Sequence, residues 1–394
     1  MKQLFFKGCI YISSCISIFI LGILFVFIIQ NGKNTLSFDL LKNHYWPNNY
    51  VGIIQQEDGY FARPVDLHQD ALWSERWGIG VIDVIEDNQS MILVEAMDKH
   101  SPFAQLQDYN HKTPLSIEIG HIIQRIQIKN LNNEITYIGS VTNNDAHHFM
   151  NALDNALSIQ NVYFQTVGGG IIGSIQATLL LIVVSLSIAI PLGLGAAIYI
   201  SEYMHESYVQ KGLKSMIEML SGVPSIIYSL IGLSVLYPIT TLFGASTTSI
   251  LLGGMTLSII LLPILIRSVE EALLVVPQGL KDASLSLGAT KFQTIYKVIL
   301  PYAFLDILNT ILLCIGRILA ESAALIYTMG TFINDTPHLL SQGTSLALHI
   351  YQIMSSETPN FSMACAVAIV ILVIILLLQC IVVMISYIMK KKVH

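Results

Sequence analysis

Four stretches without a charged side chain constrain this chain more than any other feature of its sequence. They cover residues 8–32, 171–200, 219–266 and 358–389, and the third is 48 residues long. A helix needs about 20 apolar residues to cross the hydrocarbon core of a bilayer. A further apolar segment, 302–330, holds only three charged residues. Because the third stretch is long enough for two spans, the sequence predicts an all-α polytopic membrane protein with six transmembrane helices.

Composition agrees with this class, since only 12% of the residues are charged against about 25% in ordinary soluble domains. We expect the two spans within 219–266 to be joined by a turn near Tyr237-Pro238 and Gly244. The first span follows Lys2 and Lys7, as a secretory signal would, but it is longer than a usual signal core and no A-x-A-like site follows it. We therefore interpret it as an uncleaved anchor.

The positions of the basic residues predict the orientation, because Lys and Arg of short loops stay on the cytoplasmic side. The loops near Ala245 and over 331–360 contain no Lys or Arg. The opposite loops and the ends of the chain carry all eleven basic residues outside the first exterior segment and the spans: Lys2, Lys7, Lys211, Lys214, Arg267, Lys281, Lys291, Lys297, Lys390, Lys391 and Lys392. Both termini are therefore predicted to be cytoplasmic.

Three parts of the chain follow from these spans. Residues 1–30 form the cytoplasmic N-terminus and first span, 31–165 an extracytoplasmic insert, and 166–394 a five-span core with a cytoplasmic loop at 267–301. The insert is too long for a simple loop and contains strand-like runs before a helical pattern at 145–164, which predicts a small α+β domain.

Charge narrows the role of this insert. It holds 8 basic and 16 acidic residues, so it would not attract an anion by electrostatic steering. A contact surface and a structural cover both remain open as its role. Seven of the eleven histidines lie in it without a metal-ligand spacing, and no metal site is predicted.

The cytoplasmic loop 267–301 contains the pattern of two short helices separated by a break. Gly288 can end the first helix in a left-handed conformation without steric cost. Leu280, Ala283, Ser284 and Leu287 repeat at i, i+3, i+4 and i+7, which gives that helix one small and mostly apolar face. A short helix of this kind at a cytoplasmic surface is predicted to bind a partner protein.

Arg317 and Glu321 raise the main chemical question, because both interrupt the apolar segment 302–330. Four residues separate them, so a continuous helix would place them on one face. Each costs about 2.5–3.5 kcal/mol at the centre of a membrane helix, so such side chains face a partner or a cavity. Three interpretations are open: an i,i+4 ion pair of Arg317 with Glu321 that merely holds two helices together, an anion pathway in which Arg317 binds oxyanions and Glu321 orients it, and a proton relay.

Four segments of the chain resemble one known family. The pattern DAS-x3-G-x9-V-x-LP at 282–301 resembles the "EAA" signature of permeases in binding-protein-dependent ABC importers. The segments 168–203, 221–233, 262–301 and 316–330 are similar to the PstA-type permease of phosphate importers and stand in the same order. The resemblance implies the type I ABC importer permease fold, in the bacterial cytoplasmic (inner) membrane.

The resemblance also implies functional residues. The residues expected to couple to the ATPase are Asp282, Ala283, Ser284, Gly288, Leu300 and Pro301. GRILAESAAL at 316–325 is similar to the family's G-R-A-x-G-E-T-A-P-L, which assigns Arg317, Glu321 and Ser322 to the substrate pathway. Ala320, Ser322 and Ala324 replace the family's Gly, Thr and Pro, and without that Gly and Pro we expect a straighter helix.

The implied function is that of a permease subunit in an ATP-driven importer of inorganic phosphate, or of another oxyanion. Its implied partners are a second, PstC-like permease subunit, a pair of PstB-like ATP-binding subunits and an extracytoplasmic phosphate-binding protein, with lipid around the spans and no nucleic acid. The chain has no G-x4-G-K-[ST] phosphate loop, so ATP and Mg would be used by the partner ATPase and no cofactor is expected here.

Two other classes fit the sequence less well. A membrane-embedded enzyme would need a nucleophile and base or metal ligands at bilayer depth, and the predicted spans contain no histidine. An ion-gradient-driven secondary transporter would show inverted repeats and broken helices at the midplane. The cytoplasmic loop with its docking pattern favours the ATP-driven importer over both.

Overall fold

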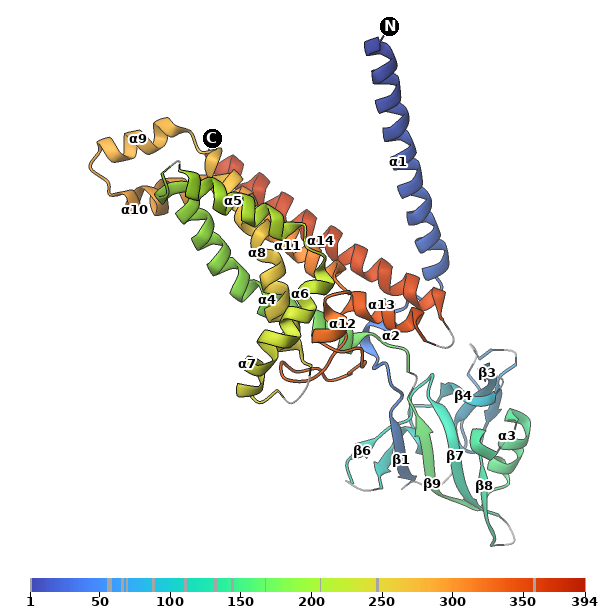
Figure 1. Cartoon of the computed structure of the whole chain (residues 1–394). Helices are drawn as coiled ribbons and strands as arrows, with labels where there is room; N and C mark the ends of the chain where they lie inside the picture. Colours follow the sequence, from blue (N-terminus) through green and yellow to red (C-terminus); the bar gives the residue numbers. More distant parts are fainter. Residues whose placement is uncertain are drawn as a thin grey trace. The chain divides into compact units, whose positions relative to one another are not determined.

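A computed structural model describes residues 2–393, apart from 55–58, 65–66, 69, 87–88, 110–111, 131–132, 143–144, 167, 206, 246–247 and 357–358. The chain divides into two compact units. One is helical and contains Met1–Tyr45 and Gly170–His394, and the other is rich in strands and spans Trp46–Gly169. Figure 1 shows both, and each is described by itself below.

The helical unit is built from long apolar helices and short connecting ones. In chain order they are α1 (Lys2–Gly32), α2 (Phe38–Lys42), α4 (Ile172–Ile198), η3 (Tyr199–Tyr203), α5 (Tyr208–Ser221), α6 (Ser225–Ile231), η4 (Gly232–Leu236), α7 (Tyr237–Leu242), α8 (Ile250–Leu274), α9 (Gln278–Ser286), α10 (Lys291–Thr294), η5 (Ile295–Ile299), α11 (Leu300–Ala320), α12 (Leu325–Thr328), α13 (Leu346–Met354) and α14 (Phe361–Val393). The segments η3, η4 and η5 are π-helical turns.

Six helical segments among the described residues are long and apolar enough to cross a membrane, as predicted. They run over Ile10–Gly32, Ile172–Tyr203, Ser225–Leu242, Ile250–Leu274, Lys291–Ala320 and Phe361–Ile388. The third span corrects one detail of the prediction. Tyr237 and Pro238 do not form a turn, because the helical run continues through them from η4 into α7. The chain leaves the helix near Gly244, whose φ of +92° favours glycine.

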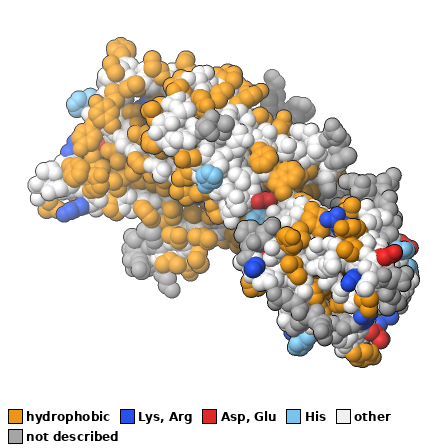
Figure 2. Space-filling model, turned by 90° about the horizontal axis from the view of Figure 1, so that it is seen from below, with side chains coloured by type: hydrophobic (Ala, Val, Ile, Leu, Met, Phe, Trp, Pro, Cys, Tyr) orange, Lys and Arg blue, Asp and Glu red, His pale blue; other side chains and the backbone are white. Residues whose placement is uncertain are grey.

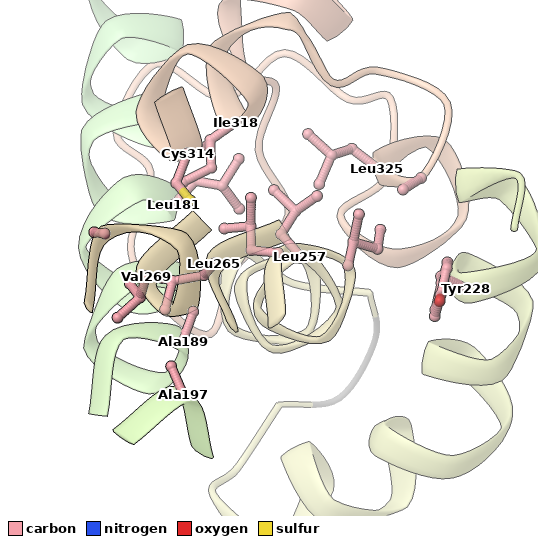
Figure 3. Packing of buried hydrophobic residues seen from close by; sticks show 14 of the residues in the cluster. Leu181, Ala189, Ala197, Tyr228, Leu257, Leu265, Val269, Cys314, Ile318 and Leu325 are labelled. Carbon is pink, nitrogen blue, oxygen red and sulfur yellow. The ribbon is translucent and has the colours of Figure 1, made fainter. Parts of the chain in front are cut away.

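The core of the helical unit lies between α4 and α8, with residues of α6, η5, α11 and α12 packed around them. Leu181, Leu257, Leu265, Cys314 and Leu325 are among its buried side chains, and Figure 3 shows how they meet. Helix approach here depends on small residues, since a Cβ atom on Gly254 of α8 would lie 2.5 Å from Cγ1 of Val184 in α4. Such contacts let backbones come close, which is how membrane helices associate.

Glycines also allow the start of the second span to lie close to the backbone of neighbouring loops. A Cβ atom on Gly170 would lie 1.9 Å from the carbonyl oxygen of Asn43, and one on Gly173 would lie 2.3 Å from that of Asn334. The glycine-rich start of this span therefore serves packing against two loops of the same unit.

The strand-rich unit contains one antiparallel sheet. Its strands are β1 (Asn49–Ile54), β2 (Leu72–Ser74), β3 (Ile79–Glu86), β4 (Gln89–Met97), β5 (Leu106–Asp108), β6 (Pro114–Leu115), β7 (Ile122–Lys129), β8 (Ile135–Ile138) and β9 (Ser158–Gln165). They are ordered β2-β3-β4-β7-β9-β1-β5-β6, with β8 paired to β7. Figure 2 shows charged side chains spread over the surface of this unit.

A helix and a separate hydrophobic core complete this unit. Helix α3 (Ala146–Asp154) begins at Asp145, whose side chain accepts a hydrogen bond from the backbone N–H of His148, and it buries Phe149 and Leu153. The predicted helical pattern over 145–164 was half wrong, because residues from Ser158 onward form β9 at the centre of the sheet. Val162 and Phe164 are buried two residues apart, as in a strand, and Ile159 is buried beyond a register shift in the pairing with β7.

Candidate functional site

Helix α11 carries an exposed polar stripe along one face. Asp306, Asn309, Leu313, Arg317 and Ala320 recur at helical spacing and are all exposed in the helical unit. The opposite side of the helix is buried, with Cys314 and Ile318 in the core. Carboxylate, amide and guanidinium groups are costly against lipid, so this face of a membrane span must meet protein or water.

A pocket of about 820 Å³ opens on this stripe. It is formed by α8, α11 and α14 and is lined by Ile264, Asn309, Leu312, Leu313, Gly316, Arg317, Ala320, Ile375, Leu378 and Gln379. Three of these side chains can donate hydrogen bonds: Asn309, Arg317 and Gln379. The sequence analysis missed Asn309 and Gln379, although each is a polar residue in an otherwise apolar run, which was a usable signal.

Arg317 and Glu321 do not share a helix face, which corrects the prediction. Helix α11 ends at Ala320, and Glu321 has an extended backbone with φ −82° and ψ 122°. The carboxylate of Glu321 accepts a hydrogen bond from the backbone N–H of Ala324 at 3.3 Å. Arg317 makes no hydrogen bond or ion pair with the side chains that the structure describes. An ion pair between these two residues on one helix face is therefore wrong for this structure.

The expected straight helix is also absent, although Ala320 and Ala324 replace the family's Gly and Pro. The break is held locally, because the carbonyl of Ser322 accepts hydrogen bonds from the backbone N–H groups of Leu325 and Ile326. With the Glu321 bond, these contacts start the short helix α12. Arg317 consequently lies in the last turn of α11, where a cation complements the partial negative charge of the helix end.

The loop between the fourth and fifth candidate spans contains two short helices separated at a glycine, as predicted. Helix α9 ends at Ser286, and Gly288 follows with φ +84°. Helix α10 begins with a capping box made by Thr290 and Gln293. The side chains of Ser284 and Thr294 bond across the break at 3.0 Å and hold the two helices together.

The bounds of this loop differ from the predicted 267–301. Arg267 lies inside α8, which continues to Leu274, and the helical run that becomes the fifth span begins at Lys291. Leu300 and Pro301 therefore start α11 within a continuous helix. Pro301 lies just after the π-helical turn η5, where the regular α-helical bonding pattern is already interrupted.

The outer surface of the loop is apolar. Leu280 and Leu285 of α9 are half exposed, Leu287 is 90% exposed and Phe292 is 61% exposed. Asp282, Ala283 and Gly288 are exposed beside them. Leu280, Leu285 and Leu287 lie before the fifth candidate span, which begins at Lys291. Large apolar side chains grouped outside the spans are typical of a protein interaction site.

The inner side of the same loop is held by a contact that the sequence did not reveal. Lys281 Nζ lies 2.6 Å from Glu202 Oε1, and the two side chains are only 12% and 9% exposed. No spacing pattern could have joined these residues, because 79 positions separate them.

Six candidate spans, a polar stripe on an apolar helix and an exposed pair of short helices are features of a polytopic membrane protein. Residues 189–391, about half of the chain, match the family described as "Binding-protein-dependent transport system inner membrane component". The chain belongs to this family.

Curated relatives include permeases named for phosphate. The chain is 31% identical over 199 residues to the "Probable ABC transporter permease protein YqgI" of Bacillus subtilis, a match covering 47% of this chain and 66% of the relative. It is 35% identical over 184 residues to the "Phosphate transport system permease protein PstA homolog" of Mycoplasma pneumoniae, covering 46% and 28%. It is 29% identical over 216 residues to the "Phosphate transport system permease protein PstC" of Xylella fastidiosa, covering 50% and 66%. The matches thus span two thirds or less of these relatives.

Proposed function

We propose that this chain is the transmembrane permease subunit of an ATP-driven importer of inorganic phosphate. It forms half of a translocation pathway, and a second, PstC-like permease subunit forms the other half. A pair of PstB-like ATPase subunits binds its cytoplasmic loop, and an extracytoplasmic phosphate-binding protein delivers the anion. The chain itself is no enzyme in this assignment. Family membership and the phosphate permeases among the relatives support the proposal.

The exposed stripe of α11 is the observation that carries the pathway assignment. Asn309 and Arg317 line a pocket that is otherwise apolar, and Arg317 has no acidic partner among the described residues. A guanidinium offers planar N–H donors that match two oxygens of a phosphate or related oxyanion. A second subunit against this face would enclose the stripe and remove it from lipid.

The cytoplasmic loop supports the coupling assignment. Asp282, Ala283, Ser284, Gly288, Leu300 and Pro301 carry the family signature. Among them, Ala283 and Gly288 lie on the exposed surface beside Leu287. Small residues next to a large exposed apolar side chain form a shape that a cleft on an ATPase could accept. ATP and Mg belong to that partner in this proposal.

The membrane orientation belongs to the same proposal. Basic residues at both ends and in the loops around α5 and α9 support cytoplasmic termini in a bacterial inner membrane. The strand-rich unit then lies outside the cytoplasm. Its acidic sequence suits contact with a partner or cover of the permease better than capture of an anion.

Uptake of radiolabelled phosphate into vesicles that contain the reconstituted complex tests the function. We expect uptake that requires internal ATP and the binding protein and that persists when ion gradients are collapsed. Competition by unlabelled sulfate and molybdate identifies another oxyanion as the substrate if either displaces phosphate at lower concentration. Uptake driven by an ion gradient without ATP would refute the importer assignment.

A further inference from the structure

The contact between Lys281 and Glu202 joins the cytoplasmic helix α9 to the end of the second span. Without this contact the two segments could move independently. Lys281 lies in α9, and Glu202 lies in η3, the π-helical turn that ends the second span. Their side-chain atoms are 2.6 Å apart, and both side chains are about nine-tenths buried. The hydroxyl of Ser201 lies 3.4 Å from the same carboxylate oxygen of Glu202.

A second contact connects the same two regions. The ammonium group of Lys291, at the start of α10, lies 5.2 Å from the ring centroid of Tyr203. A cation this close to an aromatic face is attracted to it. Because Glu202 and Tyr203 are neighbours in η3, both helices of the cytoplasmic loop are fixed to one turn at the end of the second span.

A hydrogen bond from α5 stabilises the end of the second span. The side-chain amide of Gln210, which is 9% exposed in α5, donates a hydrogen bond to the carbonyl of Ile200 at 2.9 Å. The π-helical turn leaves backbone carbonyls without regular partners, and Gln210 satisfies one of them. A force on η3 is therefore carried into both α4 and α5.

We propose that the Glu202–Lys281 ion pair is the positioning contact that passes movement of the cytoplasmic helix α9 to the second span. This inference rests on the proposed function, because α9 moves only if an ATPase binds it. The chain connects α9 directly to α8 and, through α10, to α11. The ion pair adds α4 to the elements that move with the loop, and α4 forms the core with α8.

Burial makes the pair suited to this role. Removing one member of a buried ion pair leaves the other charge without compensation, so either single change should loosen the contact. An exposed pair would be screened and easily exchanged for water. The chain offers such a pair as a control, since Arg267 and Glu218 contact each other with 53% and 56% of their side chains exposed.

The test compares Glu202→Gln, Lys281→Gln and the exchanged pair Glu202→Lys with Lys281→Glu, using Glu218→Gln as the control. Each is assayed in the full complex for copurification with the ATPase, ATP hydrolysis and phosphate uptake. We expect both single variants to keep copurification and hydrolysis but to lose about tenfold in uptake per ATP, within the range of coupling effects between sites. The exchanged pair should recover part of this loss, and Glu218→Gln should match the wild type.

Hydrogen exchange at residues 199–203 provides a readout that needs no phosphate. Binding of the ATPase to α9 should slow exchange there in the wild type but not in the single variants. Unchanged uptake per ATP in both single variants, with exchange slowed as in the wild type, would overturn the inference. Loss of assembly in the single variants and the exchanged pair alike would also overturn it, since the pair would then serve folding. If the wild-type complex takes up no phosphate, the proposed function is refuted. The hydrogen-exchange measurement at residues 199–203 then decides by itself whether the Glu202–Lys281 pair connects α9 to the second span.

Discussion

The Nδ1 atom of His349 lies 2.6 Å from the hydroxyl oxygen of Ser174, although 175 positions separate the two residues. His349 belongs to α13, outside the six candidate spans, and it is fully buried. Its ring contacts Tyr45 edge to face, and its Nε2 atom has no hydrogen-bond partner among the described atoms. Burial lowers the pKa of His349 to about 4, and the carboxylate of Asp335 opposes this shift.

Stability should therefore fall in mildly acidic solution. A histidine whose folded pKa lies below its unfolded value stabilises the protein above about pH 6.5 and loses that contribution as the pH falls toward 4. Between pH 7 and pH 5 we expect a loss on the order of 2 kcal/mol in the free energy of unfolding. Thermal unfolding in detergent at both pH values measures this, and His349→Asn should lower the pH dependence. His100→Asn is the control, because the side chain of His100 is 88% exposed. An equal pH dependence in wild type and His349→Asn would contradict the prediction.

Packing of α4 against α8 should depend on Gly254. A Cβ atom there would lie 2.5 Å and 2.7 Å from two carbons of Val184, whose branched side chain has little freedom to turn. Gly254→Ala should thus destabilise the helical unit by about 1–3 kcal/mol. Gly195→Ala is the matched change, because no atom lies within 4 Å of a Cβ at that position of α4. Denaturant titration in mixed micelles should show a loss for the first and a neutral effect or small gain for the second.

Arg317 should be needed for transport but not for assembly. Arg317→Gln should abolish phosphate uptake, and Arg317→Lys should keep part of it, because one ammonium group cannot reproduce the paired donors of a guanidinium. Since α11 ends before Glu321, the double change Arg317→Leu with Glu321→Leu should not restore uptake. Radiolabelled phosphate uptake by complexes of equal subunit content decides this. Wild-type uptake by the double variant would show that the two residues serve only each other.

Leu287 should contribute to ATPase binding. Its side chain is 90% exposed next to Gly288, so Leu287→Ser removes apolar surface without disturbing the fold. Leu287→Ser tests docking without backbone strain. A bulky residue at Gly288 would not, because φ +84° is unfavourable for any side chain. We expect at least a several-fold loss of copurifying ATPase. Leu242→Ser is the control, because Leu242 is 84% exposed at the end of the third candidate span, away from the loop that contains Leu287. Equal ATPase recovery from both variants would remove Leu287 from the docking surface.

The strand-rich unit should fold without the helices. Its buried side chains, including Trp77, Phe103, Phe149 and Phe164, form a core of their own. Residues 46–169 expressed alone should give one cooperative thermal transition by circular dichroism. A disordered spectrum would show that this core needs the rest of the chain.

The sequence was most informative where a single physical requirement dominates. Apolar length predicted all six candidate spans, because the bilayer admits few other solutions. Gly288 predicted the break after α9, since its left-handed backbone favours glycine.

The sequence was least informative where individual hydrogen bonds and strand pairing, and not the hydrophobic pattern, decide the structure. Nothing in the apolar run around Ala320 announces the end of α11, because good helix formers continue beyond it and the break is held by the Glu321 side chain. The β9 segment had helical spacing, but its place between β7 and β1 made it a strand. Tertiary contacts of this kind override local preference.

Strands β1 and β9 have a consequence for how this permease could have arisen. They pair antiparallel with Asn49 opposite Gln165, and Thr166 bonds back to Asn48. The polypeptide therefore enters and leaves the strand-rich unit through adjacent points. A module with adjacent ends can be gained or lost within one loop while the surrounding helices keep their spacing. Replacing residues 46–169 by a short glycine-serine bridge should accordingly yield a smaller permease that still inserts its six spans.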